Sequence, residues 1–235
     1  MKPYQKIPIE DNGEILVPIP LDKFAVEHPH PYEKLGANYQ GRSAYFLRKT
    51  VLAALLNAQE KLQNRYPGWR IKIFDAYRPI AVQQFMVDYS FELVLQQRGL
   101  SKAQLTSTLE ADCWEAVYKI WAIPSHNPAT PPPHSTGAAV DITLVNENDQ
   151  VLSMGGEIDE LSDRSDPNYY SDQRTAEAQR HHSNRQLLNT VMVESGFHRH
   201  PGEWWHFSLG DQMWALQENR LYPEKKTVAS YGGVN

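Results

Sequence analysis

Residues 138–145 read AAVDITLV, which is apolar at every position except Asp141 and Thr143. A nearly continuous apolar run of this length is typical of a strand that is buried on both faces. The turn-forming stretch NENDQ follows at 146–150, and VLSM at 151–154 predicts that the chain returns beside the strand as a hairpin. The rest of the chain is therefore expected to cover a sheet that contains this strand.

Periodic patterns predict the elements that surround this strand. Apolar residues recur at helical spacing in four segments, at about 43–65, 79–98, 101–121 and 173–195. Alternating or aromatic-rich segments predict two more strands, RIKIF at 70–74 and EWWHFSL at 203–209. This mixture indicates an α+β fold, with a small central antiparallel sheet flanked by helices.

The length of 235 residues is that of a single domain, with enough chain to bury a sizeable core. Residues 1–42 are rich in Pro, Gly, Asn and Tyr and lack sustained periodicity, so we expect an irregular N-terminal arm with a short strand at 14–17. The segment 222–235 is expected to be a peripheral tail.

Composition and charge limit the kinds of partner and metal site that the protein can have. A net charge of −5 argues against a nucleic-acid partner. No segment reaches the ~18 apolar residues of a membrane span, and the N-terminus lacks an apolar run of signal-peptide length, so we expect a soluble, cytoplasmic protein. Because Cys113 is the only cysteine, any metal ion must be held by His, Asp or Glu side chains.

Three residues could supply such a metal site. A catalytic zinc ion usually has three protein ligands of the His or carboxylate type and one open position. His134 precedes the buried strand and Asp141 lies within it, and the flexible Gly137 between them can turn both side chains toward one point. His206 would be the third ligand. Spacing alone is weak support, because a single His near a turn is more often an ordinary surface or core residue.

If the segment EWWHF is a strand, its geometry conflicts with placing Glu203 and His206 in the same site. Side chains alternate along a strand, so Glu203 and His206 would point to opposite faces unless the chain bends, or the strand begins, at Glu203. A second metal site at His198 and His200 is a weaker candidate.

The motifs DAYRP at 75–79, HSTGAAVD at 134–141 and EWWH at 203–206 occur in that order. With them the chain resembles the zinc D-alanyl-D-alanine dipeptidases, the family that includes the vancomycin-resistance dipeptidase, over roughly residues 30–210. The resemblance implies a single zinc peptidase domain with one zinc ion per chain, held by His134, Asp141 and His206. It also implies that Glu203 is the general base and that Arg78 stabilises the transition state.

Further motifs extend the resemblance. MGGEID at 154–159 is similar to the family's Met-Gly-x-x-Phe-Asp, whose aspartate is implicated in holding the substrate ammonium, which implies that role for Asp159. The family's N-terminal tyrosine, in the substrate site, corresponds to Tyr32. Asp75 could orient Arg78 through a charge-assisted hydrogen bond, or the two could form a purely structural ion pair.

The chain departs from the family directly before the first proposed ligand. The dipeptidases carry serines there that are implicated in substrate binding, whereas this chain has Pro132 and Pro133. That contact must therefore be absent or replaced.

The implied function is hydrolysis of the small dipeptide D-Ala-D-Ala to free D-alanine, with Glu203 as general base toward a water activated by zinc. Two alternatives stay open. One is a D,D-carboxypeptidase that removes the terminal D-Ala from peptidoglycan stem peptides, and the other is a non-catalytic, zinc-stabilised binding module. Retention of Glu203 and Arg78 argues against the binding module, because a structural zinc site needs neither. The resemblance fits roles in antibiotic resistance, in recycling of cell-wall dipeptide for nutrition, or in hydrolysis of another dipeptide.

Overall fold

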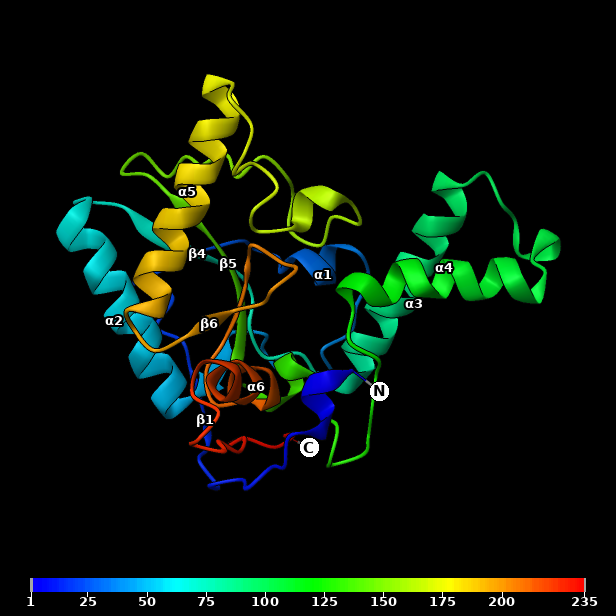
Figure 1. Cartoon of the computed structure of the whole chain (residues 1–235), viewed down its shortest axis with the longest axis horizontal. Coiled ribbons are helices and arrows are strands. Elements are labelled where there is room, and N and C mark those ends of the chain that lie inside the picture. The colour runs from blue at the N-terminus through cyan, green and yellow to red at the C-terminus, as the bar shows by residue number, and fades with distance from the viewer. Residues whose placement is uncertain (1, 235) are drawn as a thin grey trace.

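The computed structural model describes residues 2–234 and has a five-stranded sheet at its centre (Figure 1). In spatial order the strands are β2 (Ala25–Val26), β4 (Arg70–Asp75), β5 (Ala139–Val145), β7 (His206–Ser208) and β6 (His198–Arg199). A second, two-stranded sheet pairs β1 (Leu16–Pro18) with β3 (Phe46–Arg48). The predicted α+β fold is confirmed.

Strand β5 is the middle strand of the large sheet. All seven of its residues are buried, as the apolar run predicts, and it pairs antiparallel with β4 on one side and β7 on the other. The sheet departs from the predicted antiparallel arrangement at one edge, because β2 runs parallel to β4. A long connection through α1, β3 and α2 separates these two strands, which is what a parallel pair requires.

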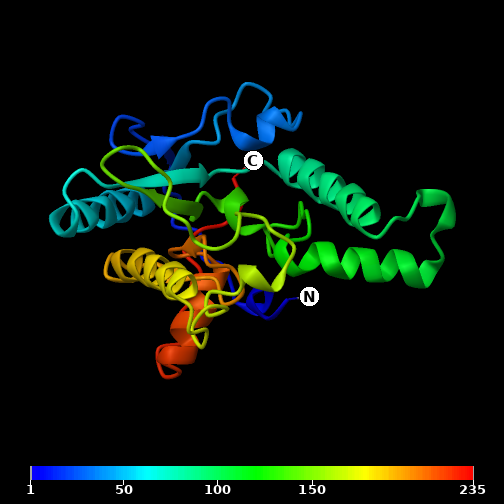
Figure 2. The ribbon, with the colours of Figure 1, turned by 90° about the horizontal axis from the view of Figure 1, so that it is seen from above.

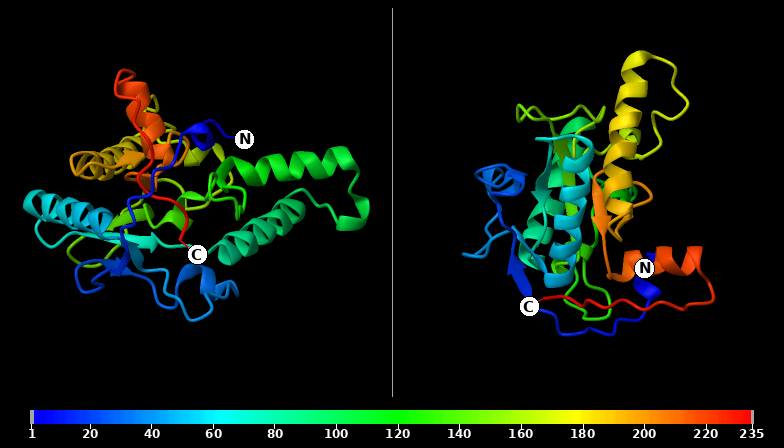
Figure 3. Two further views of the ribbon diagram at one scale, coloured as in Figure 1. Left: turned by 90° about the horizontal axis from the view of Figure 1, so that it is seen from below. Right: turned by 90° about the vertical axis from the view of Figure 1, so that its left-hand side faces the viewer.

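Helices cover the sheet unequally. Helices α2 (Lys49–Arg65) and α5 (Ala176–Val193) pack against each other (Figure 3). They share one hydrophobic core with alternate residues of the central strands: Ile71, Ile73, Val140, Ile142 and Phe207. Side chains alternate along a strand, so the residues between these, including Asp141 and His206, point to the opposite face. The two faces of the sheet therefore differ in kind: one is core, and the other carries polar groups.

Helices α3 (Ile80–Gln97) and α4 (Ser107–Ile120) form a pair that projects from the body of the molecule (Figures 1 and 2). Their contact has its own hydrophobic core, which contains Cys113, Val87 and Phe91. This pair joins the sheet through the segment that follows β4 and through Trp121, which is buried at the end of α4.

Short helices complete the fold. They are α1 (Pro31–Lys34), α6 (Gln212–Leu221) and the 3-10 turns η1 (Pro3–Lys6), η2 (Lys102–Gln104), η3 (Pro133–Thr136) and η4 (Asp163–Ser165). Helix α6 was not predicted. Its start is nevertheless marked in the sequence, because the Asp211 side chain accepts a hydrogen bond from the backbone N–H of Trp214 and so caps the helix.

Several predicted elements differ from the structure in extent, three of them clearly. The helix expected from residue 43 begins at Lys49, because residues 46–48 pair with β1 instead. The hairpin return after β5 is reduced to one bridge between Val145 and Val151, and Gly155 then turns the chain away with φ +78°. The segment 203–209 is a strand only at His206–Ser208.

Residues 8–12 of the N-terminal arm and residues 229–230 near the other end of the chain lie side by side (Figure 3). Ile9 and Ala229 form a parallel bridge, and the N–H of Glu10 donates to the carbonyl of Ala229 at 2.8 Å. The expectation of a peripheral segment at 222–235 is therefore wrong for Ala229 and Tyr231, which are buried. Within residues 2–234 we find no helix with the length and apolar character needed to cross a bilayer.

Candidate active site

Two of the predicted ligands are brought together by strand register. Asp141 of β5 and His206 of β7 are direct partners across the antiparallel pair, and both point to the face of the sheet opposite α2 and α5. Nδ1 of His206 lies 3.0 Å from Oδ1 of Asp141. The site therefore follows from the pairing of two strands whose residues are far apart in the sequence.

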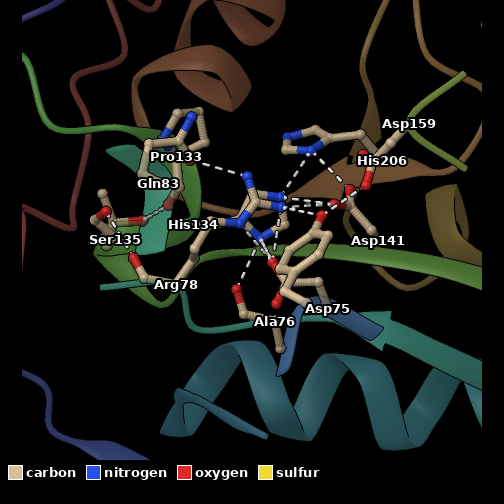
Figure 4. A network of polar contacts seen from close by, with 12 residues as sticks. Asp75, Ala76, Arg78, Gln83, Pro133, His134, Ser135, Asp141, Asp159 and His206 are labelled. Carbon is tan, nitrogen blue, oxygen red and sulfur yellow. Dashed lines mark hydrogen bonds and ion pairs between the residues drawn. The ribbon is translucent and has the colours of Figure 1, made fainter. Parts of the chain in front are cut away.

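His134 reaches the same point from the turn η3, directly before β5. Gly137 ends this turn in the left-handed region with φ +71°, where a residue with a side chain would be strained, and a Cβ added there would lie 2.2 Å from the Leu16 side chain. The Nδ1 atom of His134 lies 2.7 Å from the carbonyl oxygen of Ala76 (Figure 4). Since a carbonyl only accepts, Nδ1 carries the proton and Nε2 presents its lone pair to the site.

The donor atoms of these three residues match what a zinc ion requires. Nε2 of His134 lies 3.1 Å from Nδ1 of His206 and 3.1 Å from Oδ2 of Asp141. In a tetrahedral site with bonds of about 2.0 Å, neighbouring ligand atoms lie about 3.3 Å apart. His134, Asp141 and His206 are the group of potential metal ligands found within residues 2–234, and all three are buried. The donor set and its compactness fit the metal.

Glu203 stands beside this group because it precedes the strand. Strand β7 begins at His206, so the alternation that would separate the two side chains does not apply, and Oε2 of Glu203 lies 3.9 Å from Nδ1 of His206. Glu203 is only 6% exposed. Burial raises the pKa of Glu203 well above its usual range, and the negative charge of Asp141 adds a smaller contribution in the same direction. The Lys2 ammonium opposes the shift. Such a carboxyl can both take up and release a proton.

Arg78 lies at the junction between β4 and α3, where the sequence placed DAYRP. Nε donates to Oδ2 of Asp75 at 2.9 Å and Nη1 donates to Oε1 of Gln83 at 2.9 Å. Nη2 donates to the hydroxyl of Tyr32 at 2.9 Å. It also donates to Oδ2 of Asp141 at 3.3 Å (Figure 4). Every nitrogen of the guanidinium is thus held, and its orientation toward the ligand group is fixed.

Asp75 contacts Arg78 and two residues of the N-terminal arm. It is fully buried, and besides Arg78 it lies 3.2 Å from Nε2 of His30 and accepts a hydrogen bond from the Tyr39 hydroxyl at 3.3 Å. Burial would raise the pKa of Asp75, but the charge of Arg78 and the contact with His30 hold it below its usual value. His30 and Tyr39 were not predicted, because nothing in their local sequence indicates that the arm folds over this carboxylate.

Tyr32 and Asp159 lie together on the far side of Arg78. The Tyr32 hydroxyl donates to Oδ2 of Asp159 at 2.8 Å. Burial is the main cause that raises the pKa of Asp159 to about 7, and the negative charge of Asp141 is the second cause. Asp159 has φ +66°, a backbone conformation that Asp tolerates better than most residues. A carboxylate with this raised pKa is stabilised by a cation.

One cavity of about 30 Å³ joins these groups. Six of the eight predicted residues line it, and Tyr32 and Asp75 stand behind them; the six are Arg78, His134, Asp141, Asp159, Glu203 and His206. A larger cleft of about 780 Å³ elsewhere on the molecule contains none of the eight. The chemistry is therefore concentrated in the smaller, more enclosed cavity.

The cavity also contains residues that the sequence did not single out. Lys2 and Tyr4 reach it from the start of the chain, and His200 and Met213 line it from the other end. The weaker candidate metal pair does not form a separate site, because His198 pairs with Glu218 at 2.7 Å while His200 faces this cavity. No local pattern marks Lys2 or Tyr4.

Comparisons with known proteins show which family this chain is similar to. Residues 25–227 match the peptidase family described as D-ala-D-ala dipeptidase. A D-alanyl-D-alanine dipeptidase of Synechocystis sp. is 52% identical over 240 residues, which cover 100% of this chain and 97% of the relative. A D-alanyl-D-alanine dipeptidase of Escherichia coli is 30% identical over 177 residues, which cover 73% of each chain. A solved mutant of the vancomycin-resistance D,D-pentapeptidase VanY, in complex with Zn(II), aligns with a TM-score of 0.45 at 15% identity, covering 88% of this chain and 89% of that chain.

Proposed function

The chain belongs to the D-ala-D-ala dipeptidase family of hydrolases, and we propose that it is a zinc-dependent dipeptidase that cleaves free D-Ala-D-Ala into two molecules of D-alanine. The observation that carries the proposal is the convergence of the His134, Asp141 and His206 donor atoms beside Glu203 and Arg78 in one small cavity. A cytoplasmic location belongs to the same proposal, because the free dipeptide is a cytoplasmic cell-wall precursor.

One zinc ion per chain would be held by Nε2 of His134, Nδ1 of His206 and a carboxylate oxygen of Asp141. When bound, zinc supplies Lewis acidity toward water and toward the scissile carbonyl. The carbonyl of Ala76 keeps His134 in the tautomer that can bind it. Two neutral imidazoles and one carboxylate leave the ion with a net positive charge.

Glu203 carries the proton between water and the leaving amine. Its position beside His206 and its raised pKa suit a group that accepts a proton from the attacking water and then gives it to the amino group of the departing D-alanine. Because the side chain is almost fully buried, bulk water does not compete for this proton.

Arg78 would stabilise the negative charge that develops on the carbonyl oxygen. We expect Arg78→Lys to lower kcat by about 10²- to 10³-fold with a smaller effect on KM. The reason is that a lysine ammonium cannot donate to Asp75, Gln83 and Tyr32 at the same time, as the planar guanidinium of Arg78 does. Steady-state kinetics test this, with thermal unfolding measured in parallel. If kcat is preserved and only the melting temperature falls, Arg78 and Asp75 form a structural ion pair.

Asp159 would bind the substrate ammonium. We expect Asp159→Asn to lower kcat/KM for D-Ala-D-Ala by about 10- to 100-fold, because a charge-assisted hydrogen bond is lost. The rate for N-acetyl-D-Ala-D-Ala, which has no ammonium group, should change little. The measurement is the ratio of the two rates in wild type and variant, and an unchanged ratio would assign the ammonium to another group.

The function is tested by alanine release from zinc-loaded protein, with four substrates side by side: D-Ala-D-Ala, L-Ala-L-Ala, N-acetyl-D-Ala-D-Ala and a stem pentapeptide. Selective cleavage of free D-Ala-D-Ala is the expected result. Faster cleavage of the blocked or longer substrates than of the free dipeptide would indicate a D,D-carboxypeptidase instead. No turnover of any substrate by protein that binds zinc would indicate a binding module.

A further inference from the structure

The D-Ala-D-Ala dipeptide has two charged ends, and the cavity so far accounts for only one of them. Asp159 offers a carboxylate for the ammonium. The substrate carboxylate needs a cation or several N–H donors, because a buried carboxylate without partners is strongly unfavourable. A donor for it should therefore line the same cavity.

The wall next to His134 cannot supply that donor. Pro133 lines the cavity and Pro132 precedes it. Proline has neither a backbone N–H nor a polar side chain, so this stretch offers no hydrogen-bond donor before His134. The carboxylate contact must come from elsewhere on the wall.

Arg78 is the first other cation to consider, and in the proposed function it already serves the scissile carbonyl oxygen. Its three nitrogens are held by Asp75, Gln83, Tyr32 and Asp141 at 2.9–3.3 Å. Its guanidinium also lies against two adjacent aromatic rings, 4.9 Å from the centre of the Tyr32 ring and 4.8 Å from that of Trp121. Turning it toward a carboxylate would break this arrangement.

Lys2 is the other cationic side chain on the cavity wall, and its ammonium has free capacity. Within residues 2–234 its one hydrogen bond goes to the carbonyl oxygen of Trp121, at 3.4 Å, whereas an ammonium has three donors. Burial lowers the pKa of Lys2, and the charge of Glu203 opposes this shift. An anionic ligand would therefore stabilise the charged form of this partly buried ammonium.

The segment that carries Lys2 is held in place. Tyr4 is 5% exposed and inserts beside Pro133 and Met213. The side-chain amide of Gln212 in α6 donates to the carbonyl of Ile7 at 2.7 Å. Lys2 therefore faces the cavity from an anchored turn rather than from a free end.

We propose that the Lys2 ammonium binds the carboxylate of the dipeptide substrate and so makes the enzyme specific for a free C-terminus. This assignment rests on the proposed function. Together with Asp159 it would place one cation and one anion on the wall of a single cavity, a charge pattern complementary to a zwitterionic dipeptide.

The test compares D-Ala-D-Ala with D-Ala-D-alaninamide, which lacks the carboxylate, using protein with an unmodified N-terminus. We expect wild type to prefer the free acid and Lys2→Met to lower kcat/KM for the acid by about 10- to 100-fold, mainly through KM, while the rate for the amide stays the same. Lys2→Arg should restore part of the preference. Lys6→Met is the matched control, because Lys6 lies in the same turn and is exposed.

The possible outcomes separate the two proposals. A fall in the rates for acid and amide by the same factor in Lys2→Met would mean that Lys2 acts through the fold or through its charge next to Glu203, and it would overturn the assignment. An unchanged preference would overturn it as well. If wild type hydrolyses neither substrate, the proposed function itself fails, and the role of Lys2 fails with it.

Discussion

Replacing His134 with Ala should remove zinc from the protein and lower kcat/KM for D-Ala-D-Ala on the order of 10⁴-fold or more, the largest effect expected for any single change. The ligand group has only three donors, and Nε2 of His134 is 3.1 Å from both of the others. With one imidazole gone, two donors cannot hold the ion against solvent. Zinc content per chain, measured after gel filtration, should fall from one toward zero.

A matched control for this loss is His126→Ala, because His126 is exposed in the loop that leads to the same turn. It should keep its zinc and its activity. Treatment of wild type with a chelator should reproduce the His134→Ala result, and added zinc should restore the wild type only. Zinc content that is unchanged in His134→Ala would contradict the ligand assignment.

Replacing Glu203 with Gln should lower kcat by about 10²- to 10⁴-fold while zinc stays bound, because the amide keeps the shape of the carboxyl and loses its ability to carry a proton. The fold should not suffer. The folded-state pKa of Glu203 is raised, so the ionised carboxyl costs stability at a pH above its unfolded value, and that cost grows until the folded pKa is passed. In zinc-free protein at pH 8, Glu203→Gln should therefore melt at the same temperature as wild type or higher.

The control for Glu203→Gln is Glu224→Gln, at an exposed position near the end of the chain, which should leave kcat unchanged. The two variants measured together separate a loss of proton transfer from a general effect of removing a negative charge. Full activity in Glu203→Gln would show that another group carries the proton, and loss of zinc would show that Glu203 helps to hold the ion.

The elements that position the ligand group could be read from local patterns. The apolar run at 138–145 forms the central strand β5, and RIKIF forms β4. Both could be predicted because a buried strand leaves a clear apolar or alternating pattern in the sequence. The need for the strand to begin after Glu203 could also be foreseen, since strict alternation would have separated Glu203 from His206.

The remainder depends on contacts between distant segments, which no local pattern records. The parallel edge strand β2 and the end of the tail at Tyr231 are placed by tertiary packing. The same holds for His30 behind Asp75 and for Lys2 on the cavity wall, since each reaches the site from an arm without periodicity. Helix α6 was missed although Asp211 marks its start, because its ten residues give a short periodic signal.

The pairing of β5 with β7 also bears on how the protein is made. Asp141 and His206 are 65 residues apart, and synthesis proceeds from the N-terminus, so β5 leaves the ribosome well before its partner strand exists. During that interval one edge of a strand that is fully buried in the folded protein has no neighbour, a state that is prone to association with other chains. A polypeptide that stops short of residue 206 would lack both a zinc ligand and the strand that closes this edge. Incomplete chains of this protein should therefore be inactive and prone to aggregate.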